Sequence, residues 1–190
     1  LNRKEHAYYN TKFVFEEVPN ELLPFDYDAL ARFPGEIEAA VTNIHTGKAE
    51  YMEVPRGKDM RDLLVATCSL PILFQPVKLG RHYYLDGGLA DSIPINRATK
   101  LGNKKVVLIL TRNMKYRKKL MTRGEHRLYQ SAYKKYPKLV ESIRRRPIVY
   151  NRTMDWVESL EKRGKIFVLR PQIKPVSRLE KNYDSLMNFY

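Results

Sequence analysis

The sequence predicts an α/β protein whose helices pack on a largely parallel sheet. Strand patterns and helix patterns alternate along the 190 residues, which is typical of parallel sheets with crossover helices. Two short runs, residues 106–110 and 166–169, are apolar without alternation, as expected for strands covered on both faces. With 43% hydrophobic and 29% charged residues the composition is that of a globular domain, and no run reaches the ~18 apolar residues of a membrane span.

The first half of the chain contains a strand pair, a helix and a third strand. Residues 37–54 predict two strands around a tight turn with Gly47 at its tip. Apolar side chains at helical spacing predict a helix over 59–70, with Asp59 as its N-cap and a proline at its end. Residues 82–86 form the aromatic strand that precedes a double glycine.

Proline and glycine mark the helix ends that follow. Pro94 lies in the first turn of a predicted helix, and Gly102 lies beyond its C-terminus. Helical spacing over 126–146 predicts a longer helix with Pro137 as a kink or boundary.

The last two predicted helices carry capping signals. Asp155 with Glu158 predicts a helix start, and Ser177 with Glu180 predicts another. We also expect the tyrosines of the 126–146 segment to pack against the core rather than to stack on nucleic-acid bases.

The net charge of +14 is placed unevenly. Residues 1–100 hold 12 Lys/Arg against 14 Asp/Glu, whereas residues 101–190 hold 23 against 7. Such a basic band attracts the phosphates of anionic lipid or nucleic acid, although a solvated face would also carry these charges. The basic segment, residues 112–146, supplies eight candidate membrane or anion contacts: Arg112, Lys115, Arg117, Lys118, Lys119, Arg144, Arg145 and Arg146.

Cysteine and histidine usage favours no metal and no cofactor. Cys68 is the single cysteine, so no internal disulfide can form, and a cytoplasmic location is expected. We expect Cys68 to be a small core residue. The four histidines show no metal-ligand spacing.

The stretch HYYLDGGLADSIPIN, residues 82–96, carries the main functional signal. Asp86, Gly87 and Gly88 by themselves indicate only a turn, because Asp and Gly favour turns for backbone reasons. An Asp at the end of an apolar strand, beside glycines that let another backbone approach, is also a setting that raises carboxylate basicity. Asp86 is therefore a candidate general base, and Asp91 a helix-entry cap.

The surroundings of this turn resemble the second conserved block of the patatin-like phospholipases. The residues that carry the resemblance are, in order, Ala66, Pro71, Phe74, Pro76, the strand 83–85, Asp86-Gly87-Gly88 and Pro94. The tail is similar to the end of bacterial members, and the resemblance covers about residues 36–190. It implies a three-layer α/β/α fold and a Ser-Asp dyad without histidine, in which Asp86 is the carboxylate.

The nucleophile of that family is absent from these residues. No G-x-S-x-G turn and no glycine-rich oxyanion loop occurs in the sequence. We therefore interpret the chain as the C-terminal portion of an incomplete patatin-like domain, with a lid or insertion (1–35), a core (36–111), and a basic helical region with the last strand and helix (112–190).

The expected function is hydrolysis of a lipid carboxylic ester, with the serine supplied by a missing N-terminal half and this chain inactive alone. The expected partners are a lipid substrate and an anionic membrane surface, to which the protein would bind peripherally. The alternatives are a nucleic-acid-binding protein or a non-catalytic scaffold that uses the basic segment, although nucleic acid is not an expected partner.

Overall fold

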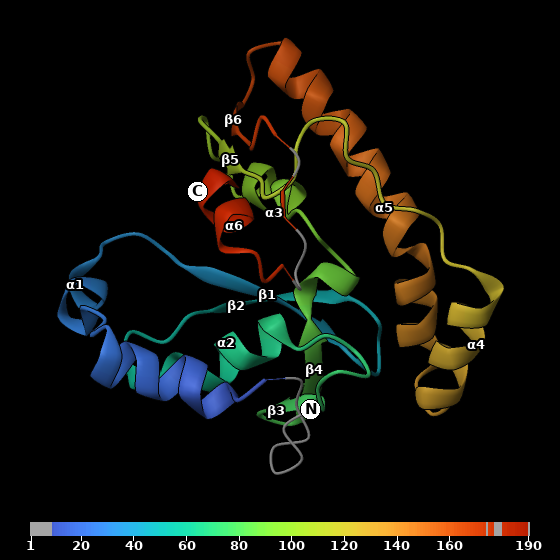
Figure 1. The fold of residues 1–190 in the computed structure, drawn as a ribbon, viewed down its shortest axis with the longest axis horizontal. Helices are drawn as coiled ribbons and strands as arrows, with labels where there is room; N and C mark the ends of the chain where they lie inside the picture. The colour runs from blue at the N-terminus through green and yellow to red at the C-terminus, as the bar shows by residue number, and fades with distance from the viewer. Residues whose placement is uncertain (1–8, 174, 177–179, 190) are drawn as a thin grey trace. The chain divides into compact units, whose positions relative to one another are not determined.

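The structure, a computed structural model, describes residues 9–173, 175–176 and 180–189 and divides into two compact units (Figure 1). The first unit comprises Leu1–Ile93 and Leu120–Arg146, and the second comprises Pro94–Lys119 and Pro147–Tyr190. The two units are described separately below.

A four-stranded antiparallel sheet forms the centre of the first unit. Its strands β1 (Glu38–Asn43), β2 (Ala49–Glu53), β3 (Val77–Leu79) and β4 (His82–Asp86) are ordered β2-β1-β4-β3. The predicted strand pair is confirmed, with Gly47 at φ 65° in its turn. Because short hairpin turns join only antiparallel strands, a largely parallel sheet is not confirmed here.

Helices cover both faces of this sheet. Helix α2 (Arg61–Cys68) packs on one face, where Leu63 and Ala66 meet Val41 and Tyr84. On the opposite face Leu85 packs against Leu139 and Val140, which belong to the start of helix α5. Side chains alternate between faces along a strand, so consecutive residues of β4 contribute to two different cores.

The predicted N-cap of α2 is wrong. Residues Lys58–Met60 form a 3₁₀ turn that continues directly into α2, and the N-cap residue Met60 makes no side-chain cap. Asp59 therefore lies inside the turn rather than ahead of the helix. Helix α3 (Ile95–Lys100) follows Pro94, and Gly102 beyond its end has φ 80°, as expected.

The segment 126–146 forms two helices rather than one. Helix α4 (Arg123–Ala132) starts at a capping box of Thr122 and Glu125, and α5 (Pro137–Lys162) starts at Pro137, so this proline is a boundary. The predicted packing of the tyrosines is confirmed, because Tyr133 is buried in the core and Tyr129 and Tyr136 pack against the same core.

The predicted helix start at residue 155 is also wrong. Helix α5 continues through Pro147 to Lys162, so Asp155 and Glu158 lie in its interior. Their carboxylates accept hydrogen bonds from Arg117 Nη2 at 2.8 and 2.9 Å instead of capping the backbone.

The second unit contains the one parallel strand pair among the described residues. Strands β5 (Val107–Ile109) and β6 (Phe167–Leu169) pair in parallel, as predicted. The prediction that both strands are covered on both faces is wrong, because Val107, Ile109 and Phe167 are 61%, 74% and 61% exposed. Helix α6 (Tyr183–Phe189) closes the chain, and Ser177 of the predicted capping box lies outside the described residues.

A helical segment, called the excursion below, precedes β1. It consists of the π-helix η1 (Phe13–Leu22) and the short helix α1 (Tyr27–Arg32), which Asp26 caps by accepting from Ala29 N at 2.7 Å. Arg56 then donates to the carbonyl oxygens of Leu30 and Phe33 at 3.3 and 3.0 Å. These bonds tie the end of the excursion to the residues that follow β2.

Candidate active site

Asp86 is the last residue of the inner strand β4, and backbone contacts fix its position from two sides. Its N–H donates to the carbonyl oxygen of Ser69, just beyond α2, at 2.8 Å. Its own carbonyl oxygen accepts from Thr42 Oγ1 at 2.8 Å. The sheet and the end of α2 therefore hold the backbone of Asp86, while its side chain stays partly exposed.

The Asp86 carboxylate uses one oxygen in the turn. Its Oδ1 accepts from Gly88 N at 2.7 Å and so caps the 3₁₀ turn Gly87–Leu89. A carboxylate offers about four lone-pair positions, so this bond leaves acceptor capacity. No hydrogen bond to Oδ2 is present within the described part of the chain. Asp86 thus caps the turn with one carboxylate oxygen and still presents a second oxygen that can accept a proton.

Gly87 allows two backbone segments to touch. A Cβ added there would lie 2.1 Å from the carbonyl oxygen of Ala40 and 2.4 Å from its carbon. Such distances are far below van der Waals contact, so only glycine fits. The close backbone approach expected from the double glycine is present, and it brings β1 against the turn.

Two side chains that were not assigned to the site lie near the carboxylate. Neighbouring protein atoms partly desolvate the Cys68 thiol and raise its pKa, and the nearby Asp86 charge raises it further. Burial also raises the pKa of Tyr9, and the charges of Cys68 and Asp86 raise it further. Cys68 is exposed in the structure, so the expected core position is wrong. It is the last residue of α2, directly before Ser69.

The Cys68 thiol provides a test of this neighbourhood. We expect Asp86→Asn to lower the pKa of Cys68, because the neutral amide no longer opposes the thiolate. The rate of alkylation by iodoacetamide at pH 8 should then rise by about twofold or more, since the thiolate is the reactive form. The control is Asp62→Asn, which removes an exposed carboxylate from the same helix. Equal rates in the wild type and Asp86→Asn would show that the carboxylate does not act on the thiol.

The predicted anion contacts of the second unit are partly engaged within it. Arg112 lies over the Tyr116 ring at 5.0 Å, and Lys118 lies over the Tyr150 ring at 4.5 Å. Burial lowers the pKa of Arg117, but its hydrogen bonds to the two carboxylates of α5 outweigh burial and leave the pKa raised. Lys115 and Lys119 remain exposed.

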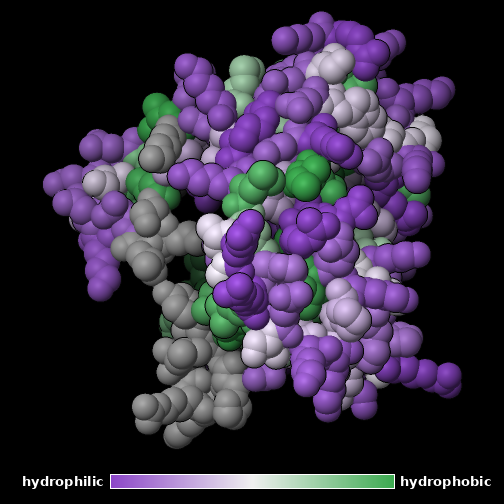
Figure 2. All heavy atoms as spheres, turned by 90° about the vertical axis from the view of Figure 1, so that its right-hand side faces the viewer, coloured by the Kyte–Doolittle hydropathy of each residue, from purple (hydrophilic) through white to green (hydrophobic). Residues whose placement is uncertain are grey.

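The three arginines at the middle of α5 have different surroundings. Arg144 pairs with Glu141 at 2.7 Å, and Arg145 is exposed. Arg146 is partly buried, and its Nη2 lies 3.4 Å from the position that a Cβ on Gly88 would take. Figure 2, which faces the side of α4 and α5, shows mostly hydrophilic side chains there. Within the first unit, the structure therefore brings Arg146 next to the Asp86 turn.

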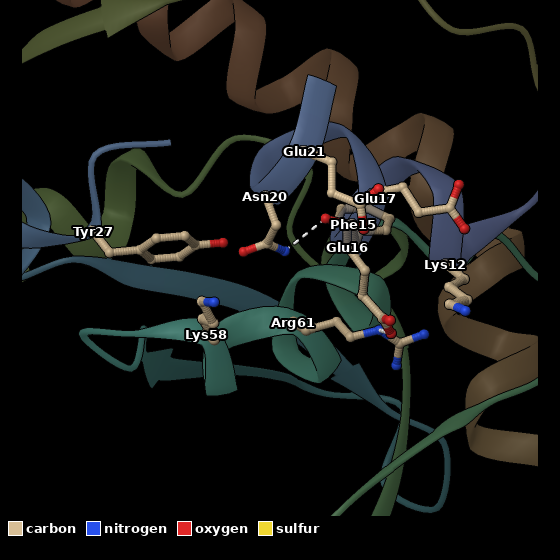
Figure 3. Close-up of a pocket in the computed structure, with 9 residues that line it drawn as sticks. All are labelled: Lys12, Phe15, Glu16, Glu17, Asn20, Glu21, Tyr27, Lys58 and Arg61. Carbon is tan, nitrogen blue, oxygen red and sulfur yellow. Dashed lines mark hydrogen bonds and ion pairs between the residues drawn. The ribbon is translucent and has the colours of Figure 1, made fainter. Parts of the chain in front are cut away.

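A separate cavity lies between η1 and the start of α2 and has a volume of about 450 Å³. Figure 3 shows Glu16 extending from η1 to Arg61, which forms an ion pair with it. Lys58 lines the same wall as Arg61, whereas Glu17 and Glu21 come from η1. Sequence reasoning assigned no site here, and the glutamates of η1 were its only signal. The ion pair joins the excursion to α2, and Asp86 does not line this cavity.

Fold and site together define an α/β protein that presents a carboxylate on a glycine turn at the end of a strand. A family model described as patatin-like phospholipase matches residues 1–99, and a model described as a domain of unknown function (DUF6363) matches residues 136–190. A search of curated proteins returned no match. The chain therefore belongs to the patatin-like phospholipase family.

Family membership confirms the resemblance found around Asp86 and extends it to the start of the chain. The patatin match includes residues 1–35, which the resemblance did not cover. It supports a lipid acyl hydrolase family and a role in lipid metabolism. The comparisons give no support to the nucleic-acid-binding alternative or to a non-catalytic scaffold.

Proposed function

We propose that this chain supplies the general base of a serine lipid acyl hydrolase, in which Asp86 activates a serine located outside these 190 residues. The substrate is a carboxylic ester of a glycerophospholipid or a similar lipid. The observation that carries the proposal is the Asp86 carboxylate, fixed at a strand end with Oδ1 in the turn and Oδ2 without a hydrogen bond to the described residues. Membership of the patatin-like phospholipase family supports the lipid substrate.

An aspartate cannot deprotonate a serine in a separate step. A serine hydroxyl holds its proton far more firmly than the carboxyl group of an ordinary Asp, so complete transfer would be uphill by about 16 kcal/mol. The proton must therefore move to Asp86 while the serine oxygen forms its bond to the acyl carbon. The carbonyl electrons move to the oxygen, where backbone donors stabilise the oxyanion by about 3 to 4 kcal/mol each.

The proton then returns to the leaving group. When the tetrahedral intermediate collapses, the bond to the leaving alkoxide breaks, and Asp86 gives its proton to that oxygen. A water molecule next repeats the sequence on the acyl-serine, and Asp86 again takes and returns one proton. We assign the transfer to Oδ2, because Oδ1 accepts from Gly88 N.

Three serines of the first unit support a nucleophile outside this chain. Ser69 Oγ is buried and donates to Val65 O at 2.7 Å, and Ser92 Oγ donates to Gly88 O at 2.6 Å. Ser142 Oγ likewise donates to the carbonyl oxygen of Gly47. Each of these hydroxyls is therefore engaged with backbone rather than turned toward the carboxylate.

The chain alone is expected to be inactive. Purified residues 1–190 should hydrolyse p-nitrophenyl butyrate no faster than buffer and should not react with a fluorophosphonate reagent for activated serines. Joining the chain to a segment that carries a G-x-S-x-G turn should produce both activities. Labelling of the chain alone would place the nucleophile within it, and Ser92→Ala, which alters the serine nearest Gly88, would identify it.

We further propose that the exposed part of the basic segment binds anionic membrane from the cytoplasmic side. No helix within the described ranges is long and apolar enough to cross a bilayer. Lys115 and Lys119 are exposed, and each basic residue near an anionic surface contributes about 1 kcal/mol.

Vesicle sedimentation tests this surface. Replacing Lys115 and Lys119 with glutamine should weaken binding to phosphatidylglycerol vesicles about thirtyfold, which corresponds to about 2 kcal/mol. The same change at Lys78 and Arg81, two exposed cations of the β3–β4 hairpin, is the control. Equal binding of the wild type to anionic and neutral vesicles would refute the proposed surface.

A further inference from the structure

Arg146 lies beside the Asp86 turn and has no polar partner among the described residues. A Cβ on Gly88 would lie 3.0 Å from Asp86 Oδ1 and 3.4 Å from Arg146 Nη2, so both atoms flank the same point of the turn. The Nε atom of Arg146 is buried and has no hydrogen-bond partner. Within the described part of the chain, Arg146 forms neither a hydrogen bond nor an ion pair.

An anion that bound the partly buried Arg146 guanidinium would stabilise it. A charged group removed from water is destabilising unless it is paired and hydrogen-bonded. Arg144, two residues earlier, shows the usual solution, because it forms two hydrogen bonds of 2.7 Å to Glu141. Asp86 Oδ1 lies beside the same glycine, yet the described residues show no hydrogen bond or ion pair between it and Arg146. The guanidinium is therefore available to a partner from outside the described residues.

A phosphate ester fits this position best. The planar guanidinium presents paired N–H donors that match two phosphate oxygens, a geometry that lysine cannot reproduce. In a glycerophospholipid only the glycerol backbone separates the phosphate from the acyl esters. A group that binds the phosphate must then lie close to the general base. Arg146 meets this condition, because Arg146 Nη2 and Asp86 Oδ1 both lie next to Gly88.

We propose that Arg146 binds the phosphate of the lipid substrate and so selects phosphate-bearing lipids at the Asp86 site. The proposal rests on the proposed function for the identity of the ligand. Arg146 thereby acts as a specificity-determining residue of the active site and is distinct from the exposed cations that meet a membrane surface.

Direct binding tests this role without any need for turnover. Isothermal titration calorimetry would compare the 190-residue chain with monomeric dihexanoylphosphatidylcholine, dihexanoylglycerol and inorganic phosphate. Arg146→Gln should weaken phosphatidylcholine binding at least about tenfold and leave dihexanoylglycerol binding unchanged. Arg146→Lys should recover part of the affinity, because the charge remains but the paired donors are lost. The control is Arg152→Gln, an exposed arginine on the same helix.

Three other outcomes would overturn the proposal. An equal loss in Arg146→Gln and Arg152→Gln would indicate general electrostatics, and a loss of dihexanoylglycerol binding would indicate a damaged site. Inorganic phosphate that binds as tightly as phosphatidylcholine would identify a free-phosphate site. Should Arg146→Gln unfold by circular dichroism, Arg146→Lys carries the comparison.

The Asp86→Asn variant separates this proposal from the proposed function. It should retain phosphatidylcholine binding, since its Oδ1 can still accept from Gly88 N. Binding that persists while no ester cleavage is found in any form of the enzyme would refute the hydrolase proposal and leave the phosphate site intact.

Discussion

Asp86→Asn in the enzyme that contains this chain is expected to lower kcat for ester hydrolysis by about 10²–10⁴-fold, the range for loss of a general base. The amide keeps the shape of the side chain and can still accept from Gly88 N, so the turn should remain. It cannot take the serine proton, because its second position carries an NH₂ group that donates rather than accepts. Initial rates with p-nitrophenyl butyrate and with a phospholipid measure the effect.

The neighbouring carboxylate Asp91 provides the matched control. Its Oδ2 accepts from the Tyr51 hydroxyl and its Oδ1 from Ile93 N at 3.3 Å, so it stabilises structure. Asp91→Asn should reduce the thermal unfolding midpoint while it leaves kcat of the folded protein nearly unchanged. Near-normal turnover in Asp86→Asn, with an unfolding midpoint equal to that of the wild type, would refute the assigned role.

Gly87→Ala is expected to produce the largest loss of stability. The added Cβ would lie 2.1 Å from the carbonyl oxygen of Ala40, and both partners are backbone that cannot rotate away. Strand β1 or the turn must shift, which should cost about 3 kcal/mol or more, at or above the upper end of overpacking effects. Urea unfolding followed by circular dichroism gives the change in the free energy of unfolding.

Gly124→Ala controls for the loss of a glycine as such. Gly124 lies in the first turn of α4, and a Cβ there meets nothing within 4 Å. Its free energy of unfolding should stay unchanged or rise by up to about 1 kcal/mol, because alanine favours a helix over glycine. Equal stability of the two variants would show that β1 and the turn do not press together as the structure has them.

Local patterns predicted the elements that position the site. The aromatic strand that ends at Asp86, the hairpin at Gly47 and the boundary at Pro137 all follow from periodicity and from the backbone preferences of glycine and proline. The same kind of reasoning misplaced the helix start at Asp155. A carboxylate pair spaced for a capping box is equally suited to bind an arginine, and Arg117 is 38 residues away from Asp155.

Neighbouring residues and their order are enough to identify the family, the carboxylate at position 86 and the glycine turn that carries it. The antiparallel sheet around Asp86, the exposure of Cys68 and the approach of Arg146 to the turn are evident only in the folded chain. These features depend on contacts between segments far apart in the sequence, which no local spacing encodes.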